Sequence, residues 1–303
     1  MPRVKAPSAA SLSVWLSEQR ALVENGLERS LAPKDARCAA VHDSMRYTLL
    51  LPGKRLRAIL VLATGEMLRQ ERARLLPAAC MVEMIHASSL ILDDLPCMDG
   101  ATLRRGKPVN HLVYGEATAV LASVALLMRA LEIPGLEAAS GRWEPQVAAE
   151  VGRRLSAAVG SEGLIAGQIV DLASVGKSLE FDALEYIHSH KTGDLFIAAA
   201  EAGGVLAGAR PRELESLHRY AKNLGLAFQI GDDLLDATGT PETTGKDTGL
   251  DRGKTTFVTF AGQSGAQRLI GELLDAARGA LAPLGERAEM LHALAEHLRH
   301  RTR

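Results

Sequence analysis

Apolar residues recur at spacings of three and four along nearly the whole chain, and no stretch alternates apolar and polar residues between turn signals. Spacings of three and four place side chains on one face of a helix, whereas a half-buried strand has a period of two. We therefore expect an all-α fold without a sheet. The segments expected to be helical are one that begins at Ser11, and then 57–69, 76–95, 113–131, 145–158, 164–173, 181–188, 193–206, 212–236, 267–281 and 286–299.

The composition suits one packed helical domain. Of 303 residues, 47% are hydrophobic and only 4% are aromatic, so the core must consist mainly of Leu, Ala, Val and Ile. Gly, Pro and polar residues mark breaks between the helices, among them the segment 133–143. No low-complexity linker divides the chain, and we expect a single domain over 1–303.

Charge and cysteine usage exclude several classes of protein. The net charge of −1 provides no overall basic field for a nucleic acid. Cys38, Cys80 and Cys97 are too few and too scattered for a disulfide framework or a zinc site, so we expect reduced thiols in a cytoplasmic protein. Neither a signal peptide nor an apolar run long enough to span a membrane is expected.

Two acidic clusters each follow a strongly apolar helical stretch. The first comprises Asp93, Asp94 and Asp99, and the second comprises Asp232, Asp233 and Asp236. Asp232 and Asp236 share a helix face, whereas Asp99 returns to Asp93 only if the helix kinks or ends near Pro96. Carboxylates without nearby His or Cys suit magnesium. A solvated helix end would explain either cluster alone, but two such clusters followed by cations favour a metal site.

Basic residues near both clusters could bind anions. They are Lys54, Arg57, Arg104, Arg105, Lys191, Lys246 and Lys254. Each alone is typical of a surface charge, but together they provide what two diphosphate groups need. No phosphate-binding loop of the Walker type and no dinucleotide glycine fingerprint is present, which argues against a nucleotide-driven enzyme.

The acidic clusters, the basic residues and the segments around them resemble, in their order along the chain, the trans-type polyprenyl synthetase family, which makes linear isoprenyl diphosphates. The resemblance covers about 45–254 and is carried by 45–57, 83–86, 90–99, 103–106, 115–117, 167–171, 191–193, 228–236 and 245–246. It implies a bundle of about ten or more helices around a deep central cavity, with the acidic clusters facing each other across its mouth. It also implies a homodimer and three Mg²⁺ ions in each active site.

The resemblance assigns roles to matching positions. It implies that the metal ligands and their supporting carboxylates are Asp93, Asp94, Asp99, Asp232, Asp233 and Asp236. It places Arg104, Lys191 and Lys246 on the allylic diphosphate, with Lys54, Arg57, His86, Arg105 and also Lys254 among the substrate-binding residues. It places Thr192 and Gln229 beside the reacting carbons. The aspartates other than Asp236, with Arg104, Lys191, Thr192, Gln229 and Lys246, are the expected catalytic set.

The implied reaction is a prenyl transfer. Isopentenyl diphosphate is condensed with dimethylallyl, geranyl or farnesyl diphosphate by magnesium-assisted ionisation, condensation and elimination. Ser88 and Ser89 lie one turn before Asp93 and are expected to set product length, because a small residue at Ser88 leaves space for a growing chain. The run 89–99 is most similar to geranylgeranyl diphosphate synthases, including bacterial ones, so a twenty-carbon product is expected. A farnesyl diphosphate synthase is the alternative, followed by a terpene cyclase or a regulatory subunit.

Overall fold

The structure of the protein, a computed structural model, describes residues 9–31, 36–238 and 255–301, and these form helices with one very short hairpin. The α-helices are α1 (Ala9–Ser30), α2 (Ala39–Leu49), α3 (Leu56–Met67), α4 (Arg72–Asp93), α5 (Asn110–Tyr114), α6 (Glu116–Ala139), α7 (Pro145–Val159), α8 (Leu164–Ala173), α9 (Phe181–His188), α10 (Asp194–Leu206), α11 (Pro211–Thr238), α13 (Phe257–Ala280) and α14 (Glu289–Arg301). Strands β1 (Leu103–Arg104) and β2 (Lys107–Pro108) pair antiparallel. The expected all-α fold is confirmed, with this hairpin as a small addition.

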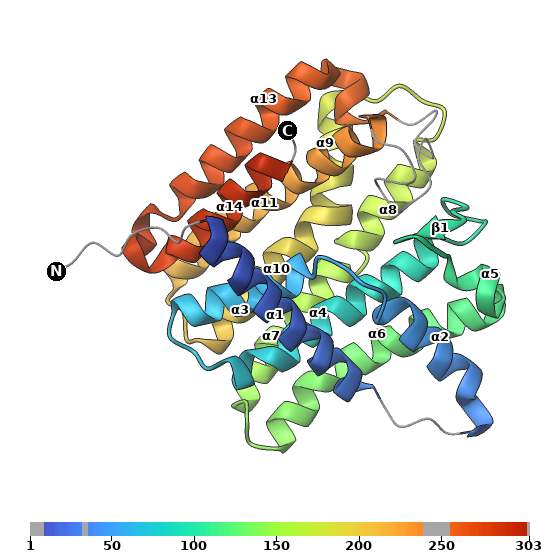
Figure 1. Ribbon diagram of the computed structural model, residues 1–303, viewed down its shortest axis with the longest axis horizontal. Coiled ribbons are helices and arrows are strands. Elements are labelled where there is room, and N and C mark those ends of the chain that lie inside the picture. Colours follow the sequence, from blue (N-terminus) through green and yellow to red (C-terminus); the bar gives the residue numbers. More distant parts are fainter. Residues whose placement is uncertain (1–8, 32–35, 239–254, 302–303) are drawn as a thin grey trace.

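The middle of the bundle is built from α3, α4, α10 and α11 (Figure 1). α4 packs against α3 and α6, α10 packs against α3, α7 and α11, and α11 packs against α13. α3 and α10 approach closely at Gly203, where an added Cβ would lie 2.3 Å from the carbonyl oxygen of Val61. The absence of a side chain at Gly203 therefore allows α3 and α10 to pack closely.

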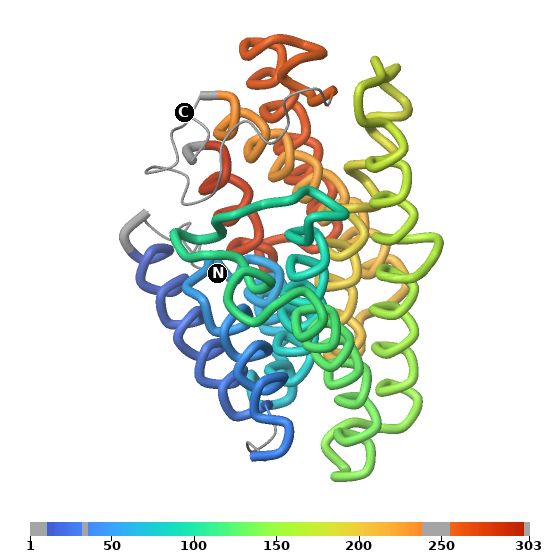
Figure 2. Tube along the Cα trace, turned by 90° about the vertical axis from the view of Figure 1, so that its right-hand side faces the viewer, coloured from blue at the N-terminus to red at the C-terminus, as the bar shows by residue number. Residues whose placement is uncertain are grey.

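The outer helices cover this middle layer on different sides. In Figure 2, α1 lies along one side of the molecule, and α7 and α8 run along the opposite side. α13 and α14 lie at one end in Figure 1, while α5 and the β1–β2 hairpin lie at the other. One continuous set of buried apolar side chains joins the layers.

Several local features differ from the sequence-based expectation, among them the start of α13 at Phe257 instead of at 267. α6 continues to Ala139 through Pro134, although a break was expected over 133–143. Pro134 is buried and packs near Gly152 of α7, so tertiary contacts outweigh the lost backbone hydrogen bond. The helices α2 and α5 and the β1–β2 hairpin were not predicted at all.

The buried face of α2 explains why its helical pattern was missed. Ser44 donates to the Asn110 side-chain oxygen at 2.7 Å, and the Asn110 amide donates to Thr48 Oγ1 at 2.8 Å. All three side chains are buried. Because this contact is polar, an apolar spacing of three and four does not reveal it.

Two helices are long and apolar enough to span a membrane by length and composition alone, which corrects the expectation that no such segment exists. They are α4 and α6. Core helices of globular proteins have the same properties, and 67% of the apolar window of α4 is buried within the fold. The corresponding window of α6 is 39% buried, so α6 leaves an apolar face uncovered.

Candidate active site

The first acidic cluster forms a tight turn at the end of α4. The backbone N–H of Asp99 donates to the carbonyl of Asp93 at 2.9 Å, and that of Gly100 donates to the carbonyl of Leu95 at 3.0 Å. Gly100 has φ 62°, a left-handed conformation that favours glycine. The expectation that the chain turns back near Pro96 and brings Asp99 towards Asp93 is confirmed.

The charge of Asp93 is held in unfavourable surroundings. Burial raises the pKa of Asp93 to about 6, Lys191 counteracts this shift, and Asp99 adds to it. A cation bound between the two carboxylates would relieve both effects. Within the described residues no three His, Cys, Asp or Glu side chains converge on one point. The two carboxylates offer oxygen donors, which magnesium takes together with water and phosphate oxygens. The oxygen-only donor set therefore fits magnesium.

Asp94 has different surroundings from Asp93. It is buried, and both of its oxygens accept hydrogen bonds from Arg104 Nε, at 2.9 and 2.8 Å. Arg104 Nη2 adds a third contact at 2.6 Å. The pair joins the end of α4 to strand β1, so the short hairpin serves to hold this guanidinium beside the acidic turn.

A widened helical turn lies between the two acidic clusters. Residues Ser189–Gly193 form a π-helix, a rare geometry that often marks functional sites. Lys191 of this turn donates to Asp171 at 2.7 Å and interacts electrostatically with Asp93. Gly167 of α8 allows the close approach, because its added Cβ would lie 2.4 Å from the backbone nitrogen of Lys191.

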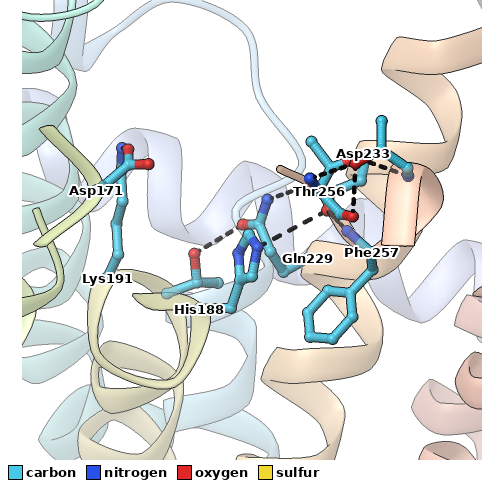
Figure 3. Close-up of polar contacts among 9 residues, drawn as sticks. Asp171, His188, Lys191, Gln229, Asp233, Thr256 and Phe257 are labelled. Atoms are coloured by element: carbon cyan, nitrogen blue, oxygen red, sulfur yellow. Dashed lines mark hydrogen bonds and ion pairs between the residues drawn. The ribbon is translucent and has the colours of Figure 1, made fainter. Parts of the chain in front are cut away.

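The next residue of the turn, Thr192, connects through Gln229 to Asp233 of the second cluster on α11. Figure 3 shows how Gln229 and Asp233 lie. Thr192 Oγ1 donates to Gln229 Oε1 at 2.7 Å, and Gln229 Nε2 donates to Asp233 Oδ1 at 2.8 Å. The backbone N–H of Phe257 reaches Asp233 Oδ2 at 3.4 Å, and His188 Nε2 lies 3.9 Å from the same oxygen. The π-turn thus presents Lys191 to one acidic cluster and Thr192 to the other.

Within the second cluster the aspartates differ in exposure. Asp232 and Asp236 are half-buried, whereas Asp233 is buried. Asp232 interacts electrostatically with Arg57 of α3, which places the second cluster near the basic residues. Asp93 and Asp232 are 139 positions apart in the sequence. In the structure, the turn Ser189–Gly193 connects the two clusters that contain them.

A group of poorly solvated basic residues lies beside these clusters. Burial lowers the pKa of Arg57 to about 10, and burial followed by the charge of Arg55 lowers that of Arg105 to about 10. Burial, followed by Arg57 and Arg105, lowers the pKa of His86 well below its usual value. The Nε of Arg57 is buried without a hydrogen-bond partner among the described residues. Buried cations that repel one another form a site for an anion.

Two aromatic rings pack against the guanidinium group of Arg57. The guanidinium of Arg57 lies 4.5 Å from the centre of the Phe196 ring and 6.0 Å from that of Phe228. Such contacts stabilise a cation that has lost its water. The ring contacts also fix the position of Arg57 between α10 and α11.

Several supporting residues were not assigned roles from the sequence. Arg55 is buried in a left-handed conformation, with φ 51°, and it binds Glu83 at 3.1 Å and the carbonyls of Leu49 and Leu51 at 2.8 Å. It therefore shapes the loop that carries Lys54 and Arg57. A charged Glu83 within an apolar helix was the available sequence signal. Asp171 belonged to the segment 167–171 that carries the family resemblance but was given no role, and His188 and Phe257 gave no signal of their own.

The other residues predicted from the sequence were not part of the contacts described above. Ser88 Oγ lies 2.9 Å from Ser123 Oγ of α6, and both side chains are buried, while Ser89 Oγ donates to the carbonyl of His86. Lys54 is exposed. Lys246 and Lys254 lie outside the described residues.

Known proteins resemble this chain over most of its length. The family model of polyprenyl synthetase matches residues 38–282. A farnesyl diphosphate synthase from Geobacillus stearothermophilus is 42% identical over 273 residues, covering 89% of this chain and 91% of the relative. A geranylgeranyl diphosphate synthase from Cyanophora paradoxa is 39% identical over 291 residues, covering 95% of this chain and 96% of the relative.

A solved structure shares the fold as well. The geranyltransferase from Helicobacter pylori, complexed with magnesium and isoprenyl diphosphate, has a TM-score of 0.84 and 30% sequence identity. The alignment covers 95% of this chain and 96% of that one. Because the family match spans most of the chain and the relatives align over nearly their full length, this chain belongs to the polyprenyl synthetase family of all-helical prenyltransferases.

Proposed function

We propose that the protein condenses isopentenyl diphosphate with an allylic diphosphate, namely dimethylallyl, geranyl or farnesyl diphosphate, and forms geranylgeranyl diphosphate. The observation that carries this proposal is the π-turn Ser189–Gly193, which joins both acidic clusters beside a buried basic group. This arrangement provides separate places for two diphosphates. A mixed set of farnesyl and geranylgeranyl synthases among the relatives agrees with the reaction class.

The carboxylate oxygens of the two acidic clusters would bind magnesium. Asp93, Asp99 and Asp232 would hold the ions, three in each active site, with Asp236 as a further half-buried carboxylate. When bound, magnesium stabilises the negative charge that develops on the departing diphosphate. The structural neighbour with magnesium and isoprenyl diphosphate supports this proposal.

Different basic residues would bind the two substrates. Arg104 and Lys191 bind the allylic diphosphate, and they stabilise it as it leaves. Arg57, His86 and Arg105 bind isopentenyl diphosphate, together with Lys54. The neutral His86 donates a hydrogen bond without adding charge, because its pKa is lowered by burial first and then by Arg57 and Arg105.

Thr192 and Gln229 would act near the reacting carbons. Their side chains are linked at 2.7 Å and lie next to Lys191 in the same turn. Their oxygen atoms can face a developing allylic cation. The departing diphosphate, rather than a side chain, accepts the proton that is lost on elimination.

Product length is assigned to the pair Ser88 and Ser123. Both side chains are small and buried, and they meet across α4 and α6 at 2.9 Å. Ser88→Phe should fill this space and shift the main product from twenty to fifteen carbons, whereas Ser88→Ala should leave it unchanged. Product length is measured by mass spectrometry after incubation with Mg²⁺, isopentenyl diphosphate and each starter separately.

The outcomes of that assay separate the alternatives. A fifteen-carbon product from the wild-type protein would favour a farnesyl diphosphate synthase and overturn the role of Ser88. No condensation with any starter in a folded, metal-loaded sample would favour a terpene cyclase or a regulatory subunit. Retention of both acidic clusters and of the basic group around Arg57 supports the synthase.

We also propose that the protein is a homodimer. Among the large apolar side chains exposed on α5 and α6 are Leu112, Val113, Val120, Leu121, Val124 and Met128. An exposed apolar surface of this kind is typical of an interaction site, and two-fold pairing would bury it against itself. A cytoplasmic location remains a prediction, which cell fractionation would test.

A further inference from the structure

The turn Ser189–Gly193 directs its side chains to two sides. Thr192 is buried, and Figure 3 shows Lys191 extending towards Asp171, to which it donates a hydrogen bond. His190, the residue before them, contacts the flanking helices α9 and α10 instead. The turn thus presents Lys191 and Thr192 to the candidate site, whereas His190 lies on its outer side.

The side chain of His190 forms a hydrogen bond that spans the turn. Its Nδ1 donates to Oδ2 of Asp194 at 2.7 Å, and Asp194 is the first residue of α10, directly after the turn. The backbone N–H of Asp194 donates to the carbonyl of Ser189 across the same turn. An ionised carboxylate only accepts hydrogen bonds, so Nδ1 carries a hydrogen whether or not Nε2 is protonated. One side-chain and one backbone hydrogen bond therefore close the turn together.

Tyr186 of α9 extends this contact in the other direction. The centre of its ring lies 4.2 Å from that of the His190 ring. Tyr186 is four residues before His190, and Asp194 is four residues after it. Residues four apart are neighbours on a helix surface. Because a π-turn holds more residues than an α-turn, it brings them closer into line. These three side chains form one outer row across α9, the turn and α10.

The other sides of the turn are held by packing alone. A Cβ at Gly167 of α8 would lie 2.4 Å from the nitrogen of Lys191, and one at Gly225 of α11 would lie 3.3 Å from the Cα of Gly193. Glycine at these positions lets both helices approach the turn closely, but van der Waals contact has little directional preference. The hydrogen bond of His190 is directional. It therefore supplies what the glycine contacts do not.

Asp194 depends on His190 for its charge. Burial raises the pKa of Asp194, and the hydrogen bond from His190 is the largest effect that opposes this rise. His218 and Lys222 of α11 act in the same direction through smaller electrostatic effects. Loss of His190 would leave a half-buried carboxylate without its main partner. A rearrangement of the turn is the expected response, because an unpaired buried charge is unfavourable.

We propose that His190 is a positioning residue: by bridging to Asp194 and packing on Tyr186, it fixes the π-turn from the outer side. In this way it determines where Lys191 and Thr192 lie, although it touches neither substrate itself. The roles of Lys191 and Thr192 rest on the proposed prenyl transfer. The effect of His190 on the turn does not.

The first test compares His190→Ala with His190→Asn by steady-state kinetics. His190→Ala should lower kcat by about tenfold to a hundredfold and raise the KM of the allylic diphosphate, because Lys191 is displaced. The KM of isopentenyl diphosphate should stay within about twofold. His190→Asn should recover most of the loss, since the Asn amide N–H can take the place of Nδ1. An equal rise in both KM values, or no recovery with Asn, would overturn the proposal.

His218→Ala is the matched control. His218 Nδ1 lies 3.0 Å from Oε1 of Glu201, so it forms a similar pair with a carboxylate of α10, but this pair joins α11 to α10 and does not span the turn. Its removal should leave kcat and both KM values within about twofold. A loss as large as that of His190→Ala would show that any imidazole on this face has the same effect.

A double variant tests whether His190 works through Asp194. Asp194→Ala should impair kcat about as much as His190→Ala does. The double variant should then be little worse than either single variant, because residues that act as a unit are not additive. Losses that multiply in the double variant would show that the two side chains act separately.

The final measurement does not depend on turnover. Amide hydrogen exchange of the peptide 186–196 is compared between the wild type and His190→Ala without metal or substrate. Exchange should be at least about tenfold faster in the variant, while peptides of α4 should keep their protection and show that the protein is folded. Unchanged exchange in 186–196 would overturn the proposal.

If His190→Ala does not fold, Tyr186→Ala decides the same question. Tyr186 is exposed, so its truncation should be tolerated, and loss of its ring contact should also accelerate exchange in 186–196. Unchanged exchange in that variant would contradict a supporting role of the outer row. A wild-type protein that condenses no starter would refute the proposed function instead, and the exchange data would still show whether His190 holds the turn.

Discussion

At the scale of single residues, Asp93 carries a charge that its surroundings oppose. Burial raises its pKa to about 6, Lys191 acts in the opposite direction, and Asp99 adds to the rise. The folded protein without metal is therefore less stable when this carboxylate is ionised. A site of this kind trades stability for function, because the same unfavourable charge favours metal binding.

Asp93→Asn should stabilise the metal-free protein while abolishing activity. The folded pKa lies above the unfolded value of about 3.9, so the cost of ionisation grows from pH 4 to 6 and stays constant above about pH 6. The gain should reach at most about 3 kcal/mol at neutral pH and vanish below about pH 4. Denaturant unfolding without divalent metal at several pH values measures it. Asp182→Asn, on the exposed start of α9, is the control, and a destabilised Asp93→Asn protein at pH 8 would contradict the argument.

At the scale of elements, the start of α11 depends on one carboxylate. Glu213 Oε2 accepts from the backbone N–H of Arg210 at 2.9 Å, and Oε1 contacts the side chains of Arg210 at 3.0 Å and Arg287 at 2.9 Å. The hydrogen bond from the Arg210 side chain is the main cause of a Glu213 pKa lowered to about 2. The acidic cluster lies on the same helix, so this cap secures the element that carries it.

Glu213→Gln should cost about 1 kcal/mol at neutral pH, the usual value of a helix cap. Because the folded pKa is below the unfolded one, the contribution is present in full above about pH 4.5 and is lost as the pH falls towards 2. Thermal unfolding at pH 7 and pH 3 measures the difference. Glu215→Gln, exposed on the same helix, should change little, and equal costs for both variants would refute a capping role.

The contact of α8 with the turn Ser189–Gly193 requires glycine at position 167. A Cβ at Gly167 would lie 2.4 Å from the nitrogen of Lys191 and 3.0 Å from the carbonyl oxygen of Ile187. Both are backbone atoms, which cannot rotate away. Substitution should therefore displace the turn that holds Lys191 and Thr192.

Gly167→Ala should lower kcat by about a hundredfold and raise the KM of the allylic diphosphate, since Lys191 moves away from its position beside Asp171. Overpacking should also cost about 1 to 3 kcal/mol of stability. Steady-state kinetics and thermal unfolding report the two effects. Gly135→Ala in α6 is the matched control, because its Cβ would meet nothing within 4 Å. Normal kinetics in Gly167→Ala would show that the turn tolerates displacement.

At the scale of the whole molecule, the uncovered face of α6 is the feature that the single chain leaves unexplained. Val120, Leu121, Val124 and Met128 repeat at spacings of three and four and are exposed. Such spacing in a buried helix would face a core. The proposed homodimer supplies the missing neighbour.

Val124→Lys should convert the dimer into a monomer, because the charge would be placed within the apolar interface. Size-exclusion chromatography with light scattering gives the mass. Val14→Lys on α1, where Val14 is also exposed, should leave the mass unchanged. A wild-type protein that is monomeric at micromolar concentration would remove the basis of the proposal.

The sequence by itself determined the helical class, most helix positions and the two acidic clusters. A 3.6-residue period reports a local property, which each segment carries without its neighbours, and helices such as Phe181–His188 were placed correctly for this reason. A turn residue such as Pro96 also acts locally. The return of Asp99 to Asp93 could therefore be predicted.

Only the tertiary structure decided the course of α6 through Pro134, the polar packing of α2, and the different surroundings of the adjacent aspartates. Asp94 and Asp233 look the same as Asp93 and Asp232 in the sequence, yet Arg104, Gln229 and the N–H of Phe257 distinguish them. These partners come from elsewhere on the chain or depend on how the helices meet. Burial and hydrogen bonding between distant segments are properties of the assembled bundle, so no local pattern could have shown how the surroundings of the two adjacent carboxylates differ.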